Sequence, residues 1–197
     1  MKKFLSFPVV IALIFLISTG ARADFEPEKD YSLVMIDAAA SGDTEAGIEA
    51  ELMRNKKIYT LGIDEQKISY GDLLLLARVI HAEAGSEWLS EEWKMAVGEV
   101  LLNRVASPEF PDTLEECVYQ EGQYCGAGES WYEDLIPYRS CVVAAKRLLS
   151  GERVLDEPSV VFQSNGPQGG GVFREYCDAY FGTTYLCYST HPELYEG

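Results

Sequence analysis

Glu83 stands out as the residue whose setting in the sequence could support acid chemistry. It lies in ARVIHAEAGSEW (77–88), where an apolar helical stretch carries a carboxylate close to its end. Val79 and Ile80 precede it by four and three positions, so helical spacing places the carboxyl on the apolar stripe. Both desolvation and the negative field of the last helical turn raise the pKa of such a carboxyl. The pattern predicts an acid that stays protonated near neutral pH, as proton donation to a glycosidic oxygen requires.

Two alternatives compete with this interpretation of Glu83. Spacing alone favours an ordinary acid that meets solvent at a helix end. His81 and Glu83 could instead suggest a metal site together with His191, but residues two apart point to different helix faces and the sequence has no His-Glu-x-x-His motif. We therefore expect neither a metal nor a cofactor.

The elements that position Glu83 have clear boundary signals. Ser69, followed by Asp72 three residues later, predicts the start of a helix that stops at Gly85, a residue suited to the C′ position. A second helix is expected to begin behind Ser90 and to run to about Val105.

The second half of the chain changes its period from helix to strand. Thr113-x-x-Glu116 predicts a short helix that reaches Tyr119, and a last helix is expected over 138–149, ending near Gly151. After it, SVVFQS and TTYLCYS are rich in β-branched and aromatic residues and predict strands. Helices followed by a small antiparallel sheet near the C-terminus indicate an α+β fold.

The beginning of the chain predicts export. Residues 1–23 combine Lys2 and Lys3, a short apolar run and an Ala-Arg-Ala site, a pattern typical of a cleaved signal peptide. An uncleaved anchor is the alternative, but the run is short for a bilayer span, and no later run is long and apolar enough. Residues 24–68 are expected to form a helical arm that is broken near Ser41-Gly42-Asp43. Residues 69–197 are expected to form the catalytic domain.

Charge and cysteine content limit the partners. The formal net charge of −16 makes nucleic acid an improbable partner, because phosphate backbones repel a polyanion. Five cysteines match no zinc spacing; in an exported chain they permit disulfides, and Cys177 with Cys187, which flank an expected turn, is the preferred pair.

Several stretches together resemble one family. LLARVIHAEAGSEW, AVGEVLLNRVASPEFPDTLEECVYQEGQY, SVVFQSNGP and YFGTTYLCYS are similar to the SleB/CwlJ-like cell wall hydrolases, the spore-cortex-lytic family, over about residues 69–190. The resemblance implies a lysozyme-like domain whose single essential acid aligns with Glu83. It also implies cleavage of peptidoglycan glycan strands, typically as a lytic transglycosylase.

Less is indicated about the residues that support Glu83. In the stretches that carry the resemblance, candidate substrate-binding residues are Trp88, Gln120, Gln123, Tyr124 and Asn165, each of which could instead serve structure. Asn103 and Arg104 are expected to brace the helix pair beside Glu83. Thr183 and Thr184 depart from the family, whose members often have an amide or imidazole there.

The choice among related activities stays open at this point. A hydrolytic muramidase would use a second carboxylate, and nothing in the spacing chooses among Glu87, Glu133, Asp134 and Asp178. A Cys-His peptidase lacks a recognisable nucleophile context, and a peptidoglycan-binding module without turnover is a further alternative. The expected protein is a monomer that acts outside the cytoplasm, at the cell wall or spore cortex.

Overall fold

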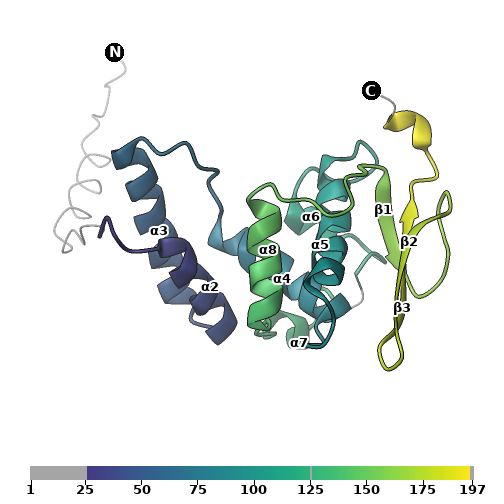
Figure 1. Cartoon of the computed structure of the whole chain (residues 1–197), viewed down its shortest axis with the longest axis horizontal. Coiled ribbons are helices and arrows are strands. Elements are labelled where there is room, and N and C mark those ends of the chain that lie inside the picture. The colour runs from purple at the N-terminus through teal and green to yellow at the C-terminus, as the bar shows by residue number, and fades with distance from the viewer. Residues whose placement is uncertain (1–25, 125, 196–197) are drawn as a thin grey trace, which may run out of the picture.

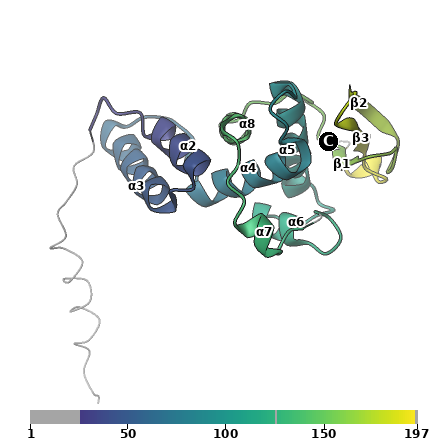
Figure 2. The ribbon, with the colours of Figure 1, turned by 90° about the horizontal axis from the view of Figure 1, so that it is seen from below.

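The computed structural model describes residues 26–124 and 126–195 of the chain. The predicted signal peptide and Cys125 lie outside these residues. The described part is elongated: the helices of the arm lie at one end, a small sheet lies at the other, and further packed helices lie between them (Figures 1 and 2).

The helical arm consists of α2 (Tyr31–Ser41) and α3 (Thr44–Leu61), which confirms the two predicted helices and the break between them. Asp30 and Asp43 begin the two helices by accepting hydrogen bonds from backbone N–H groups of the first turn. Met35 and Ala50 are buried in the same apolar cluster as residues of α4 and α8, so the arm shares the core of the rest of the molecule. The domain boundary at residue 68 stays a prediction.

The two helices around Glu83 form as predicted. In α4 (Tyr70–Ala84), Ser69 Oγ accepts a hydrogen bond from the Asp72 N–H at 3.2 Å, and in α5 (Glu91–Ala106) Ser90 Oγ accepts one from the Trp93 N–H at 3.2 Å. The segment 93–101 of α5 is buried throughout, so α5 is the central helix of the domain.

Gly85 ends α4 for a different reason than a C′ glycine usually does. Its φ of −72° lies in the right-handed region that any residue can adopt. A Cβ atom at this position, however, would lie 2.1 Å from His81 Cδ2 and 2.2 Å from the His81 carbonyl oxygen. Close approach to His81, and not a left-handed turn, is what requires glycine here.

The remaining helices are short or lie against the core. The predicted helices appear as α6 (Leu114–Tyr119) and α8 (Arg139–Leu149), while α7 (Ser130–Glu133) was not expected within the glycine-rich loop. A 3-10 turn, η1 (Pro192–Leu194), follows the sheet. Helices α4, α5 and α8 pack together in the middle of the molecule, with α6 and α7 along one side (Figure 2).

The sheet confirms the α+β class. Strands β1 (Val160–Ser164), β2 (Val172–Asp178) and β3 (Gly182–Tyr188) are antiparallel in the order β1-β3-β2. β1 and β3 match the two predicted strands. β2 was not predicted as a strand, because it is an edge strand with exposed positions and a charged sequence, VFREYCD, that lacks the apolar signal of a buried strand.

The expected disulfide between Cys177 and Cys187 is wrong, because both residues are free thiols. Cys177 pairs with Thr183 in the β2–β3 ladder, four positions before Cys187 on β3. That separation corresponds to about 13 Å along a strand, whereas a disulfide needs Cα atoms within about 7 Å. The two cysteines flank a turn in sequence but lie at opposite ends of the ladder.

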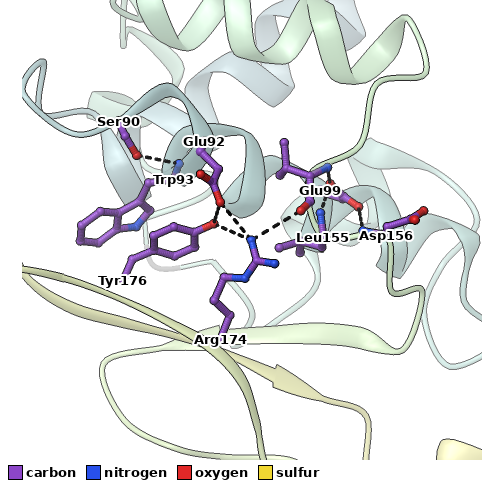
Figure 3. Close-up of polar contacts among 9 residues, drawn as sticks. Ser90, Glu92, Trp93, Glu99, Leu155, Asp156, Arg174 and Tyr176 are labelled. Carbon is purple, nitrogen blue, oxygen red and sulfur yellow. Dashed lines mark hydrogen bonds and ion pairs between the residues drawn. The ribbon is translucent and has the colours of Figure 1, made fainter.

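Polar contacts fix the sheet and the preceding loop to α5 (Figure 3). Glu92 Oε1 accepts hydrogen bonds from Arg174 Nη1 and the Tyr176 hydroxyl, both at 3.0 Å, and the Tyr176 ring stacks on Trp93. Two turns further along α5, the buried Glu99 carboxylate accepts hydrogen bonds from three backbone N–H groups of residues 154–156 at 2.6–3.1 Å. These contacts hold the sheet in a fixed position beside the end of α4.

Candidate active site

Glu83 lies in the last turn of α4 with a half-buried side chain. Its helical neighbours Val79 and Ile80 are fully buried, whereas Ala82 is exposed. The carboxyl therefore stands at the border between the core and the surface. Such a position is partly desolvated and is not an open-water helix end.

The surroundings of Glu83 favour its neutral form. Burial raises the pKa of the Glu83 carboxyl, and the positive charge of Arg104 partly opposes this rise. The direction agrees with the expectation from the sequence, with desolvation as the main cause. A carboxyl with a raised pKa beside a cation can hold a proton at first and carry a negative charge after it has given the proton away.

Arg104 is a buried cation in the last turn of α5, only 4% exposed. Its Nε donates to the Val161 carbonyl at 2.6 Å, and its guanidinium lies over the rings of Phe110 and Tyr124, 5.1 and 5.2 Å from their centroids. Its Nη1 is buried without a hydrogen-bond partner among the described residues. Sequence reasoning missed this residue as part of the site, since nothing in the local pattern shows that its charge reaches Glu83.

The expected bracing by Asn103 and Arg104 has a different target. Asn103 Nδ2 donates to the carbonyls of Glu157 and Val160, both at 3.0 Å, and Arg104 reaches Val161. The two residues thus attach α5 to strand β1 and the segment before it. The expectation that they brace the helix pair is therefore corrected. A buried polar side chain hydrogen-bonds to carbonyl groups that lack another partner, and here those carbonyls belong to the edge strand β1 and the segment before it.

Tyr124 is brought to Glu83 by the tertiary structure. Burial raises the pKa of Tyr124 to about 12, Arg104 lowers it, and Glu83 raises it, so the three groups are within electrostatic reach of one another. With 8% exposure and a guanidinium over the ring, Tyr124 has little ring face left for a sugar. This favours packing over stacking for the ring, while the buried hydroxyl has no hydrogen-bond partner in the described chain.

The other expected binding residues lie in three places. Gln120 and Gln123 form a turn before Tyr124, in which the Gln123 N–H donates to the Gln120 carbonyl at 3.2 Å; the Gln120 side chain is exposed and that of Gln123 half-buried. Asn165 is exposed directly after β1. Trp88 is 65% exposed in the loop between α4 and α5.

Each of the four carboxylates considered as a second catalytic group has structural contacts or is exposed. Glu133 accepts a hydrogen bond from the Tyr119 hydroxyl at 2.7 Å and pairs with Arg78 at 3.7 Å. Asp178 accepts the backbone N–H groups of Tyr180 and Phe181, and these bonds lower the pKa of its carboxyl. Glu87 and Asp134 are exposed.

A residue that sequence reasoning did not consider is Gln163 on β1. Its Oε1 is buried without a hydrogen-bond partner among residues that the structure describes. Gln163 pairs with Leu186 of β3, and Leu186 packs on Ala96 and Val100 of α5. Cross-strand partners share a face of the sheet, so Gln163 lies on the face that meets α5. No local signal distinguishes this position from any other polar residue in a strand.

Within residues 26–124 and 126–195, no group of three or more metal-binding side chains is close enough together to hold an ion. In the same residues, no helix has the length and apolar character that a membrane span needs.

The fold and site define a helical domain with a small sheet and a candidate general acid at a helix end. Residues 90–166 match the family model described as Cell Wall Hydrolase. The match confirms the predicted resemblance to the SleB/CwlJ-like cell wall hydrolases over this range. The matched range begins seven residues after Glu83, so the carboxyl itself lies outside it. Neither the curated proteins nor the solved structures give a significant match to the chain.

Proposed function

We propose that this protein cleaves peptidoglycan glycan strands between N-acetylmuramic acid and N-acetylglucosamine as a lytic transglycosylase. The observation that carries the proposal is the half-buried Glu83, whose pKa is raised by desolvation and whose side chain lies within reach of the Arg104 charge. The match to the cell wall hydrolase family supports peptidoglycan as the substrate. It also supports a place of action outside the cytoplasm; a role at the spore cortex in germination is a narrower proposal of the same kind.

One carboxyl is sufficient for this reaction. Protonated Glu83 donates its proton to the bridging oxygen while the bond from that oxygen to C1 of the muramic acid breaks. The resulting carboxylate then takes the proton of the C6 hydroxyl of the same sugar, and that oxygen bonds to C1 to close a 1,6-anhydro ring. Glu83 ends protonated again, and no water is consumed.

Arg104 supports the middle of this cycle. When Glu83 has given up its proton, a negative charge remains in a partly desolvated place, which is costly without a nearby cation. The Arg104 charge lowers that cost, as its opposing effect on the Glu83 pKa indicates. We therefore assign Glu83 the acid and then the base role, and Arg104 the stabilisation of the carboxylate.

Product analysis on purified sacculi and cortex fragments tests the proposal. The wild-type protein is expected to release soluble anhydro-muropeptides, detected by mass spectrometry, and Glu83→Gln to release none. Glu49→Gln is the matched control, because Glu49 is an exposed carboxylate on α3 of the helical arm and takes no part in the site. It is expected to retain most of the wild-type activity.

Other products would overturn the proposal in defined ways. Reducing-end muropeptides would indicate a hydrolytic muramidase that uses a second carboxylate, and severed peptide stems a peptidase. Binding to sacculi without any fragments would indicate a binding module. Full activity of Glu83→Gln would remove Glu83 from the mechanism.

A further inference from the structure

A surface hollow lies at the C-terminal end of α4, where Ala82 and Gly85 line it. Glu83 lies in the same turn of the helix but does not line the hollow. The aromatic walls of the hollow come from three separate segments: Trp88 in the α4–α5 loop, Tyr138 before α8, and Phe181 in the β2–β3 turn. His81 and Glu87 supply polar groups to the same hollow. Apolar rings combined with a few polar groups are typical of small-ligand sites.

Asp178 holds two of these walls in place. Its Oδ1 accepts the Trp88 indole N–H at 3.4 Å and the backbone N–H groups of Tyr180 and Phe181, both at 2.8 Å. Edge contact with the buried Trp93, at 5.4 Å between ring centroids, fixes the Phe181 ring as well. Trp88 therefore stays exposed in a defined position, although it is a large apolar side chain that packing alone would tend to bury.

His81 and Tyr138 form the opposite part of the hollow. Their rings stack with centroids 4.4 Å apart, and the Tyr138 backbone N–H donates to His81 Nδ1 at 3.1 Å. Burial lowers the pKa of His81, and a hydrogen bond to the Ile136 backbone partly opposes this fall. The hollow thus offers the polar edge of the His81 ring and the carboxylate oxygens of Glu87.

We propose that this hollow binds one N-acetylhexosamine ring of the glycan strand, next to the bond that Glu83 cleaves; the substrate class rests on the proposed function. The apolar face of a pyranose matches the Trp88 and Phe181 rings, and its hydroxyl and acetamido groups match the polar groups of His81 and Glu87. Fixed walls reduce the ordering cost of binding, which favours affinity for a flexible polymer. Because short-range contacts supply the affinity, the strongly acidic net charge of the protein is no obstacle to it.

Binding to an N-acetylglucosamine tetramer and to sacculi, measured with the full chain carrying Glu83→Gln, tests the hollow separately from catalysis. Adding Trp88→Ala or Phe181→Ala is expected to weaken binding about tenfold or more, as loss of a central aromatic contact commonly does. Trp88→Phe should restore part of the affinity. Tyr180→Ala is the matched control, because its side chain is 92% exposed in the same turn and its backbone N–H to Asp178 is retained.

The outcomes separate this proposal from the proposed function. Unchanged binding in folded Trp88→Ala and Phe181→Ala overturns the sugar site, whether or not the wild type cleaves sacculi. Weakened binding in these variants supports the site even if the wild type gives no products, which would refute only the catalytic proposal. In the active protein, Trp88→Ala is expected to raise KM and to leave kcat within about twofold, since Trp88 binds the strand and does not move a proton. Circular dichroism and thermal unfolding of each variant show that a loss of binding is not a loss of folding.

Discussion

At the scale of single residues, Glu83 combines two requirements that conflict in most proteins. A general acid must keep its proton at the working pH, and it must also carry a charge after donating that proton. Partial burial at the end of α4 supplies the first condition, and the Arg104 charge supplies the second. The same arrangement has a cost in stability, because a desolvated carboxylate is unfavourable when it ionises.

The stability of the protein is therefore expected to depend on pH through Glu83. Because burial raises its pKa in the folded state, the folded protein binds more protons than the unfolded chain between the ordinary glutamate pKa and the raised value. The free energy of unfolding should therefore fall as pH rises through this interval. Glu83→Gln has no such titrating group. At pH values above the interval, its free energy of unfolding is expected to exceed that of wild type by about 1 kcal/mol, and below the interval by less.

Urea unfolding of wild type, Glu83→Gln and Glu87→Gln at pH 4 and pH 8 measures this difference. Glu87→Gln, at an exposed position, is the control. A Glu83→Gln difference that is equal at both pH values would contradict a raised pKa. Activity should decline over the same interval as pH rises, since the acid form of Glu83 is lost.

At the scale of elements, the loop between α4 and α5 connects the candidate acid to the proposed sugar site. It begins two residues after Glu83 and carries Trp88. The buried Lys94 of α5 holds this loop, because its Nζ donates to the carbonyls of Ser86 at 3.0 Å and Leu89 at 2.7 Å. A cation that bonds two loop carbonyls is suited to a positioning role.

Replacing Lys94 by Met is expected to disturb this loop. The two carbonyls lose their donor, which should lower the free energy of unfolding by about 1–3 kcal/mol. Because Trp88 would then be held less firmly, binding of the N-acetylglucosamine tetramer should weaken several-fold. Lys67→Met, at an exposed position, is the control. A higher free energy of unfolding in Lys94→Met would mean that removing a buried charge outweighs the two lost hydrogen bonds. Unchanged tetramer binding would mean that Lys94 does not position the loop.

At the scale of the whole molecule, the helical arm shares a core with the helices that carry the site. Met35 of α2 is 2% exposed and lies in one cluster with Leu73 and Leu76 of α4 and with Leu148 of α8. An ion pair between Asp37 and Arg139 also joins α2 to the start of α8. The arm is thus packed as part of the fold and does not behave structurally as a spacer.

This packing predicts that damage to the arm destabilises the entire protein. Met35→Ala should lower the free energy of unfolding by about 2–4 kcal/mol and move a single cooperative transition. Leu52→Ala, on the outer face of α3 with 61% exposure, should change it by less than about 0.5 kcal/mol. Denaturant unfolding followed by both far-UV circular dichroism and tryptophan fluorescence measures the effect. Two separate transitions in Met35→Ala would show that the arm folds independently.

The sequence by itself determined the features that depend on neighbouring residues. Ser69, Ser90 and Thr113 begin their helices where expected, because each accepts a hydrogen bond from a backbone N–H three residues away. The change from helical to strand residues likewise predicted the α+β class, and helical spacing placed Glu83 on the apolar stripe of its helix. The family resemblance, not the spacing, selected Glu83 as the catalytic residue.

Only the tertiary structure decided which distant residues meet. Arg104 and Tyr124 follow Glu83 by 21 and 41 positions, and their mutual influence arises from packing that no local pattern encodes. The strand β2 exists because it pairs with β3, and the register of that pairing separates Cys177 from Cys187. Hydrogen bonds between near neighbours act whenever the chain folds locally, whereas these contacts form only after loop closure has brought the elements together, so their partners cannot be read from spacing.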